Sequence, residues 1–411
     1  MIKAQRGTKD IFGDESLTWQ WILKNAQNVF QNACFSEIKT PIFEATELFA
    51  RGVGDSTDIV NKEMYTFSVG GAEKDNSSIT LRPENTAGVV RAFIEHNIVR
   101  QSPPQKFWYF GPMFRYERPQ AGRQRQFHQI GVEMFGVKEA SADAEVILAA
   151  VNFLKSVGLG DLEVELNTLG CPKCKNDYRN SIKEILKPHL ENMCDDCKMR
   201  YEKNPLRILD CKNENCQKIF EIPEIKEVIL KDYICDECLE HFNELINYLD
   251  NLNIKYSRNK LLVRGLDYYN RTVFEIKSSA LGSQSAVCGG GRYDGLVEML
   301  GGQPTPAVGF AMGVERLYTL VNKIEAQKID YYVVSTNTLE ALKLVQKLRE
   351  QGVVADFDMQ ARKFAKQLEK ASKVAKRAII LGEDEISQGF YSVKNLETGE
   401  QTKFSKFEEL I

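Results

Sequence analysis

The chain has 411 residues, more than one hydrophobic core usually organises, so we expect two or three domains. Charged residues make up 27% and hydrophobic residues 43%, and the formal net charge is -3, which excludes a strongly basic chain and confines any nucleic-acid contact to a local surface. The N-terminus lacks an apolar signal region, and no segment approaches the roughly 18 apolar residues of a membrane span. The sequence therefore predicts a cytoplasmic protein without a membrane partner.

The first part of the chain alternates helical and extended patterns. Apolar residues at helical spacing predict a helix over 15–33, and a short strand is expected over 35–39, ending at Thr40-Pro41. Further strands are predicted at 78–81, 106–110, 127–135 and 162–167, and further helices at 84–96 and 142–157. Beyond a cysteine-rich block come strands at 260–263 and 272–277, a glycine triplet at 289–291 and a helix beginning near Val314.

Two fold classes follow from these patterns. Strands that are not separated by regular helices predict an α+β fold, an antiparallel sheet flanked by helices. The last 85 or so residues instead alternate strands (331–334, 353–356, 378–381) with helices (339–350, 362–377), which predicts a small α/β domain with a largely parallel sheet. The segment 322–327 is the expected linker.

The stretch from Phe114 to Arg123 gathers arginines around Glu117, just before a Pro/Gly turn. This is the pattern of two antiparallel strands whose same-face side chains project into one cleft. Arginine binds phosphate or carboxylate through paired hydrogen bonds, so the stretch predicts an anion site. The alternative is a salt-bridged hairpin face in water. Neither common glycine loop for nucleotides occurs in the chain, so a nucleotide would have to be held by arginines.

Eight of the ten cysteines form four close pairs. In a reducing compartment this arrangement favours metal ligation over disulfides. Eight thiolates could complete two tetrahedral Zn²⁺ sites, which would be structural because no position is left open for a substrate. The alternative is reduced cysteines without a metal. The pairs are Cys171 and Cys174, Cys194 and Cys197, Cys211 and Cys216, and Cys235 and Cys238.

Several of these segments carry a resemblance to a known family. Phe114-Arg115-Tyr116-Glu117 resembles motif 2 of the class II aminoacyl-tRNA synthetases, and Arg264-Gly265-Leu266-Asp267-Tyr268-Tyr269 resembles the signature peptide of the histidyl-tRNA synthetases. Further matching pieces occur in the family's order at 6–10, 39–41, 81–84, 289–294 and 309–316. The N-terminal helix and strand match the family's motif 1, which implies a homodimer.

The resemblance implies four segments. Residues 1–167 and 246–322 would form two parts of a class II catalytic core, and 168–245 a cysteine-rich helical insertion between them. Residues 328–411 would form an anticodon-binding α/β domain. The implied reaction is ATP-dependent ligation of L-histidine to tRNA(His) through a histidyl-adenylate, with release of AMP and pyrophosphate.

The resemblance also assigns roles at the nucleotide. Arg115 would contact the α-phosphate and the histidine carboxylate, Glu117 the adenine amino group, and Arg316 the γ-phosphate. Arg123 is a further candidate for ATP binding. Arg264 is the candidate for charge stabilisation at the α-phosphate, so Arg264 and Arg115 form the expected catalytic set, with Mg²⁺ accompanying the departing pyrophosphate.

Recognition of histidine requires polar partners for both imidazole nitrogens and for the ammonium group. By resemblance, Glu133 and Tyr269 would form hydrogen bonds with the imidazole nitrogens. For the tyrosine pair, the alternative is ordinary strand packing. The remaining members of the expected histidine pocket are Glu84, Asn85, Thr86, Arg115, Gln129, Arg264 and Tyr268. Asn85 replaces a glycine common in the family, so a contact through its backbone is expected there.

Two regions are candidates for contact with tRNA. Gln120 and Arg123 lie in the hairpin loop that reaches the acceptor end in the family. The predicted helix over 362–377 carries seven basic residues and one acid, among them Lys363, Lys366 and Lys370. A solvated turn and a solvated cationic face are the respective alternatives.

Two other functions are compatible with parts of the pattern. A synthetase-like regulatory subunit of ATP phosphoribosyltransferase typically lacks the arginine signature and the C-terminal domain, and both are present here. A class II ligase for another amino acid is disfavoured by the signature peptide together with Glu133.

Overall fold

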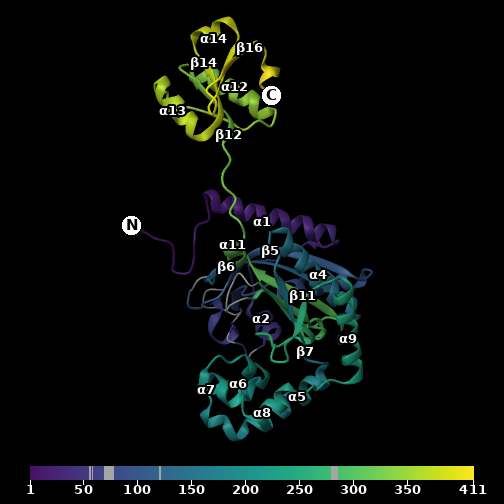
Figure 1. Ribbon diagram of the computed structural model, residues 1–411. Coiled ribbons are helices and arrows are strands. Elements are labelled where there is room, and N and C mark those ends of the chain that lie inside the picture. Colours follow the sequence, from purple (N-terminus) through teal and green to yellow (C-terminus); the bar gives the residue numbers. More distant parts are fainter. Residues whose placement is uncertain (55–56, 58, 69–77, 120–121, 279–285) are drawn as a thin grey trace. The chain divides into compact units, whose positions relative to one another are not determined.

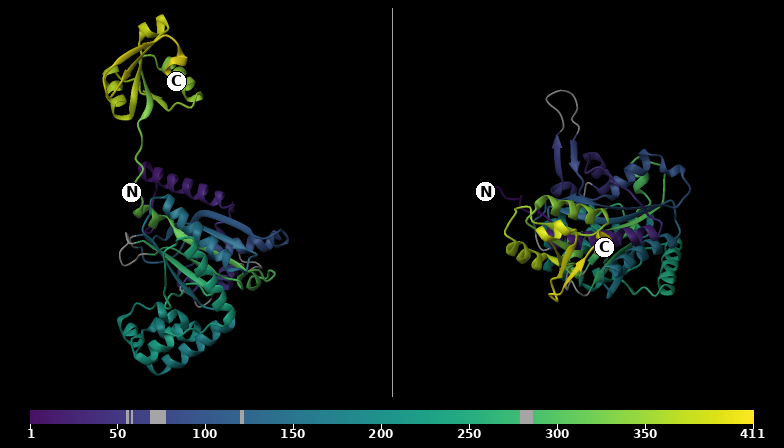
Figure 2. Two further views of the ribbon diagram at one scale, coloured as in Figure 1. Left: turned by 45° about the vertical axis from the view of Figure 1, so that its right-hand side comes forward. Right: turned by 90° about the horizontal axis from the view of Figure 1, so that it is seen from above.

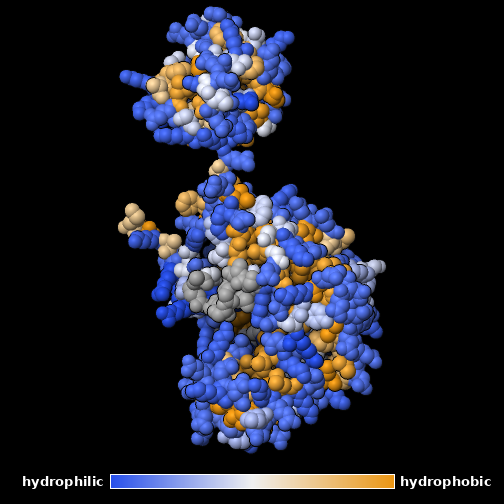
Figure 3. Space-filling view, in the orientation of Figure 1, coloured by the Kyte–Doolittle hydropathy of each residue, from blue (hydrophilic) through white to orange (hydrophobic). Residues whose placement is uncertain are grey.

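The computed structural model describes residues 1–54, 57, 59–68, 78–119, 122–278 and 286–411. The chain forms two compact units, Met1–Ile324 and Glu325–Ile411 (Figure 1). The division lies within the predicted linker. No described helix is both long and apolar enough to cross a membrane. The face shown in Figure 3 is mostly hydrophilic, with apolar residues in scattered groups.

The first unit is built on a mostly antiparallel sheet, as the sequence predicts. Only its edge pairs β1/β5 and β7/β8 are parallel within the described strands. The strand order is β1 (Ser36–Glu37), β5 (Gln105–Phe114), β6 (Gln126–Phe135), β11 (Ala307–Gly313), β10 (Ala286–Arg292), β9 (Asn270–Ser278), β7 (Leu162–Thr168) and β8 (Tyr256–Arg258).

One face of this sheet is covered by α1 (Gly13–Asn32), α4 (Ala140–Ser156), α9 (Asp236–Asn251) and α11 (Val314–Leu320). On α1 the side chains of Trp19, Ile22, Ala26 and Phe30 are buried. Their spacing of three or four residues gives one apolar stripe along the helix. Such spacing allows a helix to be predicted here from the sequence.

Alternation along β6 separates the core from the functional face. Ile130, Val132 and Met134 join the core under α1 and α4. Gln129 and Glu133 point to the opposite face, because neighbouring strand residues project to opposite sides. On that face lie α2 (Thr46–Val53), η1 (Ile59–Glu63), α3 (Thr86–Glu95), η2 (Ile98–Arg100), α10 (Leu296–Met299) and a small sheet of β2 (Phe43–Ala45), β4 (Ser78–Leu81) and β3 (Tyr65–Ser68).

The cysteine-rich segment is helical (Figures 1 and 2). Its buried side chains form a hydrophobic core of their own. It comprises α5 (Pro172–Leu186), η3 (Lys187–Asn192), α6 (Asp195–Lys203), η4 (Pro205–Asp210), α7 (Glu214–Phe220) and α8 (Pro223–Leu230). Helix α9 starts immediately after Cys235 and continues into the main unit, where it packs on α4. The cysteine-rich segment is thus fixed to the main sheet of the first unit through a continuous helix.

A buried ion pair links α4 to β10. The guanidinium of Arg292 and the carboxylate of Asp143 are both inaccessible to solvent. Arg292 Nε lies 3.1 Å from Asp143 Oδ2, and Nη1 lies 3.1 Å from Asp294 Oδ1. His241 of α9 adds Nε2 at 3.3 Å from Asp143 Oδ2. The network therefore joins elements that are far apart in sequence.

The second unit has the strand order β13 (Ala355–Phe357), β12 (Ile329–Ser335), β14 (Ala375–Leu381), β15 (Tyr391–Asn395) and β16 (Gln401–Phe404). Its helices are α12 (Thr338–Glu350), α13 (Phe364–Val374), α14 (Glu383–Gln388) and η6 (Phe407–Leu410). The first three strands are parallel, as predicted. The antiparallel strands β15 and β16 were not predicted, because β16 is largely exposed and carries no apolar alternation.

One strand prediction was wrong. Residues 260–263 form a turn and an irregular segment instead of a strand, and the neighbouring strand β8 ends at Arg258. Asn167 Nδ2 donates to the carbonyls of Lys260 and Leu262 at 3.1 and 3.0 Å. A side chain thus replaces the ladder partner that a strand would need.

Candidate active site

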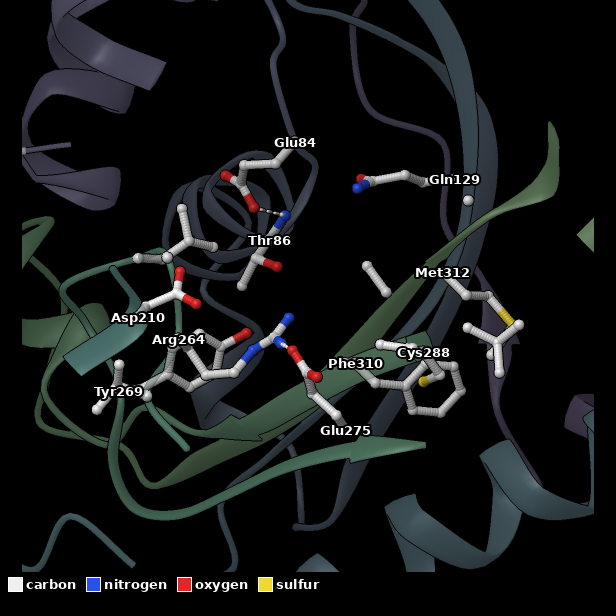
Figure 4. A pocket seen from close by; sticks show the side chains of 18 of the residues that line it. Glu84, Thr86, Gln129, Asp210, Arg264, Tyr269, Glu275, Cys288, Phe310 and Met312 are labelled. Carbon is white, nitrogen blue, oxygen red and sulfur yellow. Dashed lines mark hydrogen bonds and ion pairs between the residues drawn. The ribbon is translucent and has the colours of Figure 1, made fainter. Parts of the chain in front are cut away.

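A cavity of about 660 Å³ opens on the face of the sheet opposite α1 and α4 (Figure 4). It is formed by residues from Ile59 to Arg316, which lie 257 positions apart in the sequence. Nearly all the residues predicted for histidine and ATP line it: Glu84, Thr86, Arg115, Glu117, Arg123, Gln129, Glu133, Arg264, Tyr268, Tyr269 and Arg316.

Asn85 differs from the other predicted pocket residues. Its side chain does not line the cavity; Oδ1 accepts from Thr40 Oγ1 at 2.6 Å and from Arg82 Nη1 at 3.2 Å. The carboxamide therefore fixes the start of α3, and only the backbone of Asn85 is left for a substrate contact. Gln120 lies outside the described residues.

Glu133 is buried at the bottom of the cavity. Its carboxylate accepts from Thr86 Oγ1 at 2.7 Å and from the hydroxyls of Tyr109 and Tyr293. Burial raises the pKa of Glu133 to about 8, and the nearby Glu84 carboxylate adds to this. The hydroxyls fix the carboxyl group in one orientation, which suits selective hydrogen bonding to a polar heterocycle.

Glu84 occupies the N-terminus of α3. Its two carboxylate oxygens accept from the backbone N–H groups of Thr86 and Ala87 at 2.8 and 3.0 Å (Figure 4). Burial nevertheless raises the pKa of Glu84, although these hydrogen bonds oppose the shift. The helix cap thus holds a carboxylate rigidly at the cavity, where a bound ammonium group would restore its charge.

Arg115 is held from two sides. Its Nε donates to the carbonyl of Pro83 at 2.9 Å, and its guanidinium lies 5.2 Å from the centre of the Phe127 ring. Burial lowers the pKa of Arg115 although several carboxylates surround it. Its terminal nitrogens make no hydrogen bond to a described residue, so they are available to an anion in the cavity.

Arg264 pairs with Glu275 of β9 in the same cavity (Figure 4). Burial opposes the charge of Arg264, but the Glu275 carboxylate outweighs it and raises the pKa of the guanidinium. Arg264 Nε and Gln129 Oε1 are buried without a hydrogen-bond partner among the described residues. Buried polar atoms of this kind usually form a hydrogen bond to a ligand or to water. Glu275 was not predicted; a glutamate between the buried Phe274 and Ile276 was the available signal.

Two further arginines, Arg123 and Arg316, line the cavity near enough for their charges to interact. Burial lowers the pKa of Arg316, and the positive charge of Arg123 lowers it further. Arg316 Nη1 donates to the carbonyl of Ala286, which fixes the guanidinium at the start of α11. Arg123 is half-exposed and lies 3.5 Å from Glu117. Two cations that repel one another favour an anion between them.

Glycines make room for these charged groups. A Cβ at Gly289 would lie 2.1 Å from Arg264 Nη2, and a Cβ at Gly309 would lie 1.9 Å from Glu133 Oε2. The glycines of β10 and β11 therefore allow the arginine and the glutamate to lie directly against the strand backbones.

The insertion also contributes to the cavity. Arg207, Leu209 and Asp210 of η4 line it, and Figure 4 shows Asp210 on the same side as Arg264. These three residues were not predicted as site residues, because their segment reads only as a spacer between two cysteine pairs.

The cysteine pairs combine into two groups of four. Cys171, Cys174, Cys235 and Cys238 form one, and Cys194, Cys197, Cys211 and Cys216 the other, with the sulfur atoms of each group within 4.8 Å of one another. Chain spacing alone does not determine this grouping.

The geometry of both groups fits a metal bound by four sulfurs. Sγ–Sγ distances are 3.5 Å for Cys171 and Cys174 and 3.7 Å for Cys194 and Cys211. A tetrahedron with Zn–S bonds of about 2.3 Å has edges of about 3.8 Å. Backbone N–H groups donate to sulfur in both groups, for example Cys235 N to Cys174 Sγ at 3.2 Å and Cys194 N to Cys216 Sγ at 3.4 Å. Such hydrogen bonds stabilise thiolate ligands.

Comparison with known proteins gives a consistent result. The family model described as histidyl-tRNA synthetase matches residues 7–317, and the anticodon-binding-domain model matches residues 329–411. The histidine–tRNA ligase of Halothermothrix orenii is 49% identical over 98% of this chain and 96% of its own length. That of Caldanaerobacter subterraneus subsp. tengcongensis is 47% identical over 98% of this chain and 97% of its own. The crystal structure of apo S. aureus histidyl-tRNA synthetase matches with a TM-score of 0.80 and 34% identity, covering 98% of this chain and 97% of that one.

Proposed function

The chain belongs to the histidyl-tRNA synthetase family, and on this premise we propose how its residues perform the ATP-dependent ligation of L-histidine to tRNA(His). The observation that carries the proposal is the single cavity that holds both the arginines expected for ATP and the carboxylates expected for histidine.

In the first step, a carboxylate oxygen of histidine attacks the α-phosphorus of ATP, and the bond from that phosphorus to the bridging oxygen of pyrophosphate breaks. Arg115 and Arg264 neutralise the two anions that must approach one another. Arg316 and Arg123 hold the terminal phosphates, and Glu117 accepts from the adenine amino group. Mg²⁺ carried by the ATP phosphates would offset the negative charge of the departing pyrophosphate.

The pocket selects histidine through polar groups that would lack a hydrogen-bond partner if another amino acid were bound. Glu133 and Tyr269 bind the imidazole nitrogens. Glu84, Thr86, Gln129 and Tyr268 surround the α-ammonium group. A buried donor or acceptor without a partner costs about 1 to 3 kcal/mol, so an apolar amino acid of similar size is rejected.

In the second step, the terminal ribose hydroxyl of tRNA(His) attacks the carbonyl carbon of the adenylate, and AMP leaves. The C-terminal unit, which matches the anticodon-binding model, binds the tRNA. We assign a phosphate contact to the basic face of α13, with Lys363, Lys366 and Lys370. Lys366 is exposed and lies 2.9 Å from Glu369, a weak pair that a phosphate can replace. Gln120 and Arg123 are assigned to the acceptor end.

Aminoacylation tests the complete reaction. With tRNA(His), ATP and each amino acid in turn, histidine alone should esterify the tRNA. A folded protein that forms no histidyl-tRNA would instead favour the regulatory-subunit alternative, which is less supported because the full-length relatives are ligases.

Gly289 provides a test of the site without removal of a charged group. Gly289→Ala should lower histidine-dependent ATP–pyrophosphate exchange about 100-fold, because the new methyl group displaces the Arg264 guanidinium. Gly160→Ala is the matched control: nothing lies within 4 Å of a Cβ there, the position lies outside the cavity, and its activity should stay within about twofold of wild type. Equal losses in both variants would show that the contact with Arg264 is not the cause.

We propose that each cysteine group binds one structural Zn²⁺. Purified protein should contain about two equivalents per chain by elemental analysis. Cys216→Ser should lose about one equivalent, whereas Cys34→Ser, at an exposed cysteine outside both groups, should lose none. Fewer than about half an equivalent in wild type would contradict the proposal.

We further propose a cytoplasmic homodimer that pairs through the motif 1 region. Exposed apolar side chains at Phe12, Ile42 and Phe43 in that region support it. A monomer in sedimentation at micromolar concentration would oppose it.

A further inference from the structure

The segment from Arg264 to Arg271 carries three of the expected substrate contacts, yet it is irregular until β9 begins at Asn270. Arg264 is fixed by Glu275. Tyr268 and Tyr269 are buried, with ring centres 4.6 Å apart, and the tyrosines must be held by contacts outside their own segment. Because the binding geometry depends on this loop, the groups that fix its backbone determine the pocket.

Lys175 of α5 is the main such group. Its ammonium donates to the carbonyl of Asp267 at 2.9 Å and to the carbonyl of Tyr269 at 2.8 Å. These two carbonyls flank Tyr268. One side chain of the insertion therefore sets the backbone on both sides of a residue that faces the substrate.

Other contacts of the insertion reach the same loop. Asn204 Nδ2 donates to Asp267 Oδ1 at 2.5 Å. Arg271 N donates to the carbonyl of Gly170 at 2.8 Å, and Arg271 Nη2 lies 2.5 Å from Glu237 Oε1. Gly170 adjoins Cys171, and Glu237 lies between Cys235 and Cys238. Together with Lys175, four residues of the insertion therefore contact the loop, at Asp267, Tyr269 and Arg271.

We propose that Lys175 is a positioning residue for histidine recognition, through which the cysteine-rich insertion holds Tyr268 and Tyr269 in their binding orientation. The inference rests on the proposed function. Lys175 is not among the residues that line the cavity; it acts through the loop backbone. A charged donor between two carbonyls makes stronger hydrogen bonds than a neutral one, and helix α5 fixes its position.

Loss of the Lys175 ammonium should weaken the binding of histidine more than the binding of ATP. Lys175→Met keeps the length and the apolar stem but removes the donors. In ATP–pyrophosphate exchange, the KM for histidine should rise about tenfold or more, while the KM for ATP stays within about twofold, because Arg115 and Arg316 are held by other contacts. Lys173→Met is the matched control, because Lys173 is an exposed lysine two positions earlier whose side chain makes no hydrogen bond to a described residue. Its KM values for histidine and for ATP should equal those of wild type.

A second readout does not depend on activity. The amides of Asp267 and Arg271 are hydrogen-bonded to Val53 and Gly170, so hydrogen–deuterium exchange should be faster over 264–271 in Lys175→Met and unchanged in Lys173→Met. The zinc content should equal that of wild type. A purely structural role would instead lower the active fraction with an unchanged KM for histidine.

An unchanged KM for histidine in folded Lys175→Met, or equal rises for histidine and ATP, would overturn the inference. If that variant does not fold, Asn204→Ala takes its place: a rise of about threefold in the KM for histidine supports the inference, and no rise overturns it. Absence of histidine-dependent exchange in wild type would refute the proposed function instead, and the deuterium exchange of the loop would then decide the positioning role.

Discussion

Arg264→Ala is expected to lower histidine-dependent ATP–pyrophosphate exchange about 10³-fold, equivalent to about 4 kcal/mol of transition-state stabilisation. Arg264 is the buried cation that the Glu275 carboxylate orients within the cavity. Negative charge on the α-phosphate and the attacking carboxylate needs a fixed cation, and a water molecule cannot replace it at equal strength.

The variant has a confounding effect that can be separated. Without Arg264, the Glu275 carboxylate is left unpaired and would repel ATP. The double variant Arg264→Ala/Glu275→Gln removes this charge and should remain at least about 100-fold below wild type. Arg100→Ala, at an exposed arginine outside the cavity, is the control and should retain full activity. Recovery of wild-type exchange in the double variant would contradict the role assigned to Arg264.

Arg292→Met is expected to cost about 3 to 5 kcal/mol of unfolding free energy, the largest stability effect among our predictions. The substitution leaves the Asp143 carboxylate inaccessible to solvent and without its guanidinium partner; the imidazole of His241, with Nε2 at 3.3 Å, stays beside it. Burial opposes the charge of Asp143, but the Arg292 guanidinium holds its pKa below the usual range, so the pair stabilises the fold above the unfolded pKa of the carboxyl group and loses its effect as the pH falls.

Denaturation can be followed selectively for this part of the protein. All three tryptophans, Trp19, Trp21 and Trp108, lie in the first unit, so their fluorescence reports its unfolding by urea at pH 7. Arg51→Met breaks an exposed ion pair with Glu47 in the same unit and should change its free energy of unfolding by less than about 1 kcal/mol. If Arg292→Met lowers the free energy of unfolding by no more than this control does, the buried ion pair does not make the contribution to stability predicted here.

The sequence predicts those parts of the site that local patterns determine. Arg115 and Glu117 follow a strand with a clear apolar pattern and precede a turn, so their place at the end of a hairpin could be inferred before the fold was known. Arg316 was likewise expected in the first turn of a helix beginning near Val314, and the structure has it in the first turn of α11. The alternation along β6 directs Gln129 and Glu133 to one face in the same way.

Contacts that depend on tertiary structure could not be read from the sequence. The pairing of Arg264 with Glu275 requires the loop to fold back on β9, and no periodicity encodes that. Asp210 enters the cavity only because the insertion packs against the loop. Cys171 and Cys174 combine with a pair more than 60 positions later because the start of α9 lies beside them. The spacing of the cysteines in the sequence does not predict this pairing.

The most direct test of the account is ATP–pyrophosphate exchange by the wild-type protein with each standard amino acid in turn. The account predicts exchange with histidine and none above background with the others, because Glu133 and Tyr269 require both imidazole nitrogens. Exchange driven by a different amino acid, or no exchange with any of them from folded protein, would contradict it.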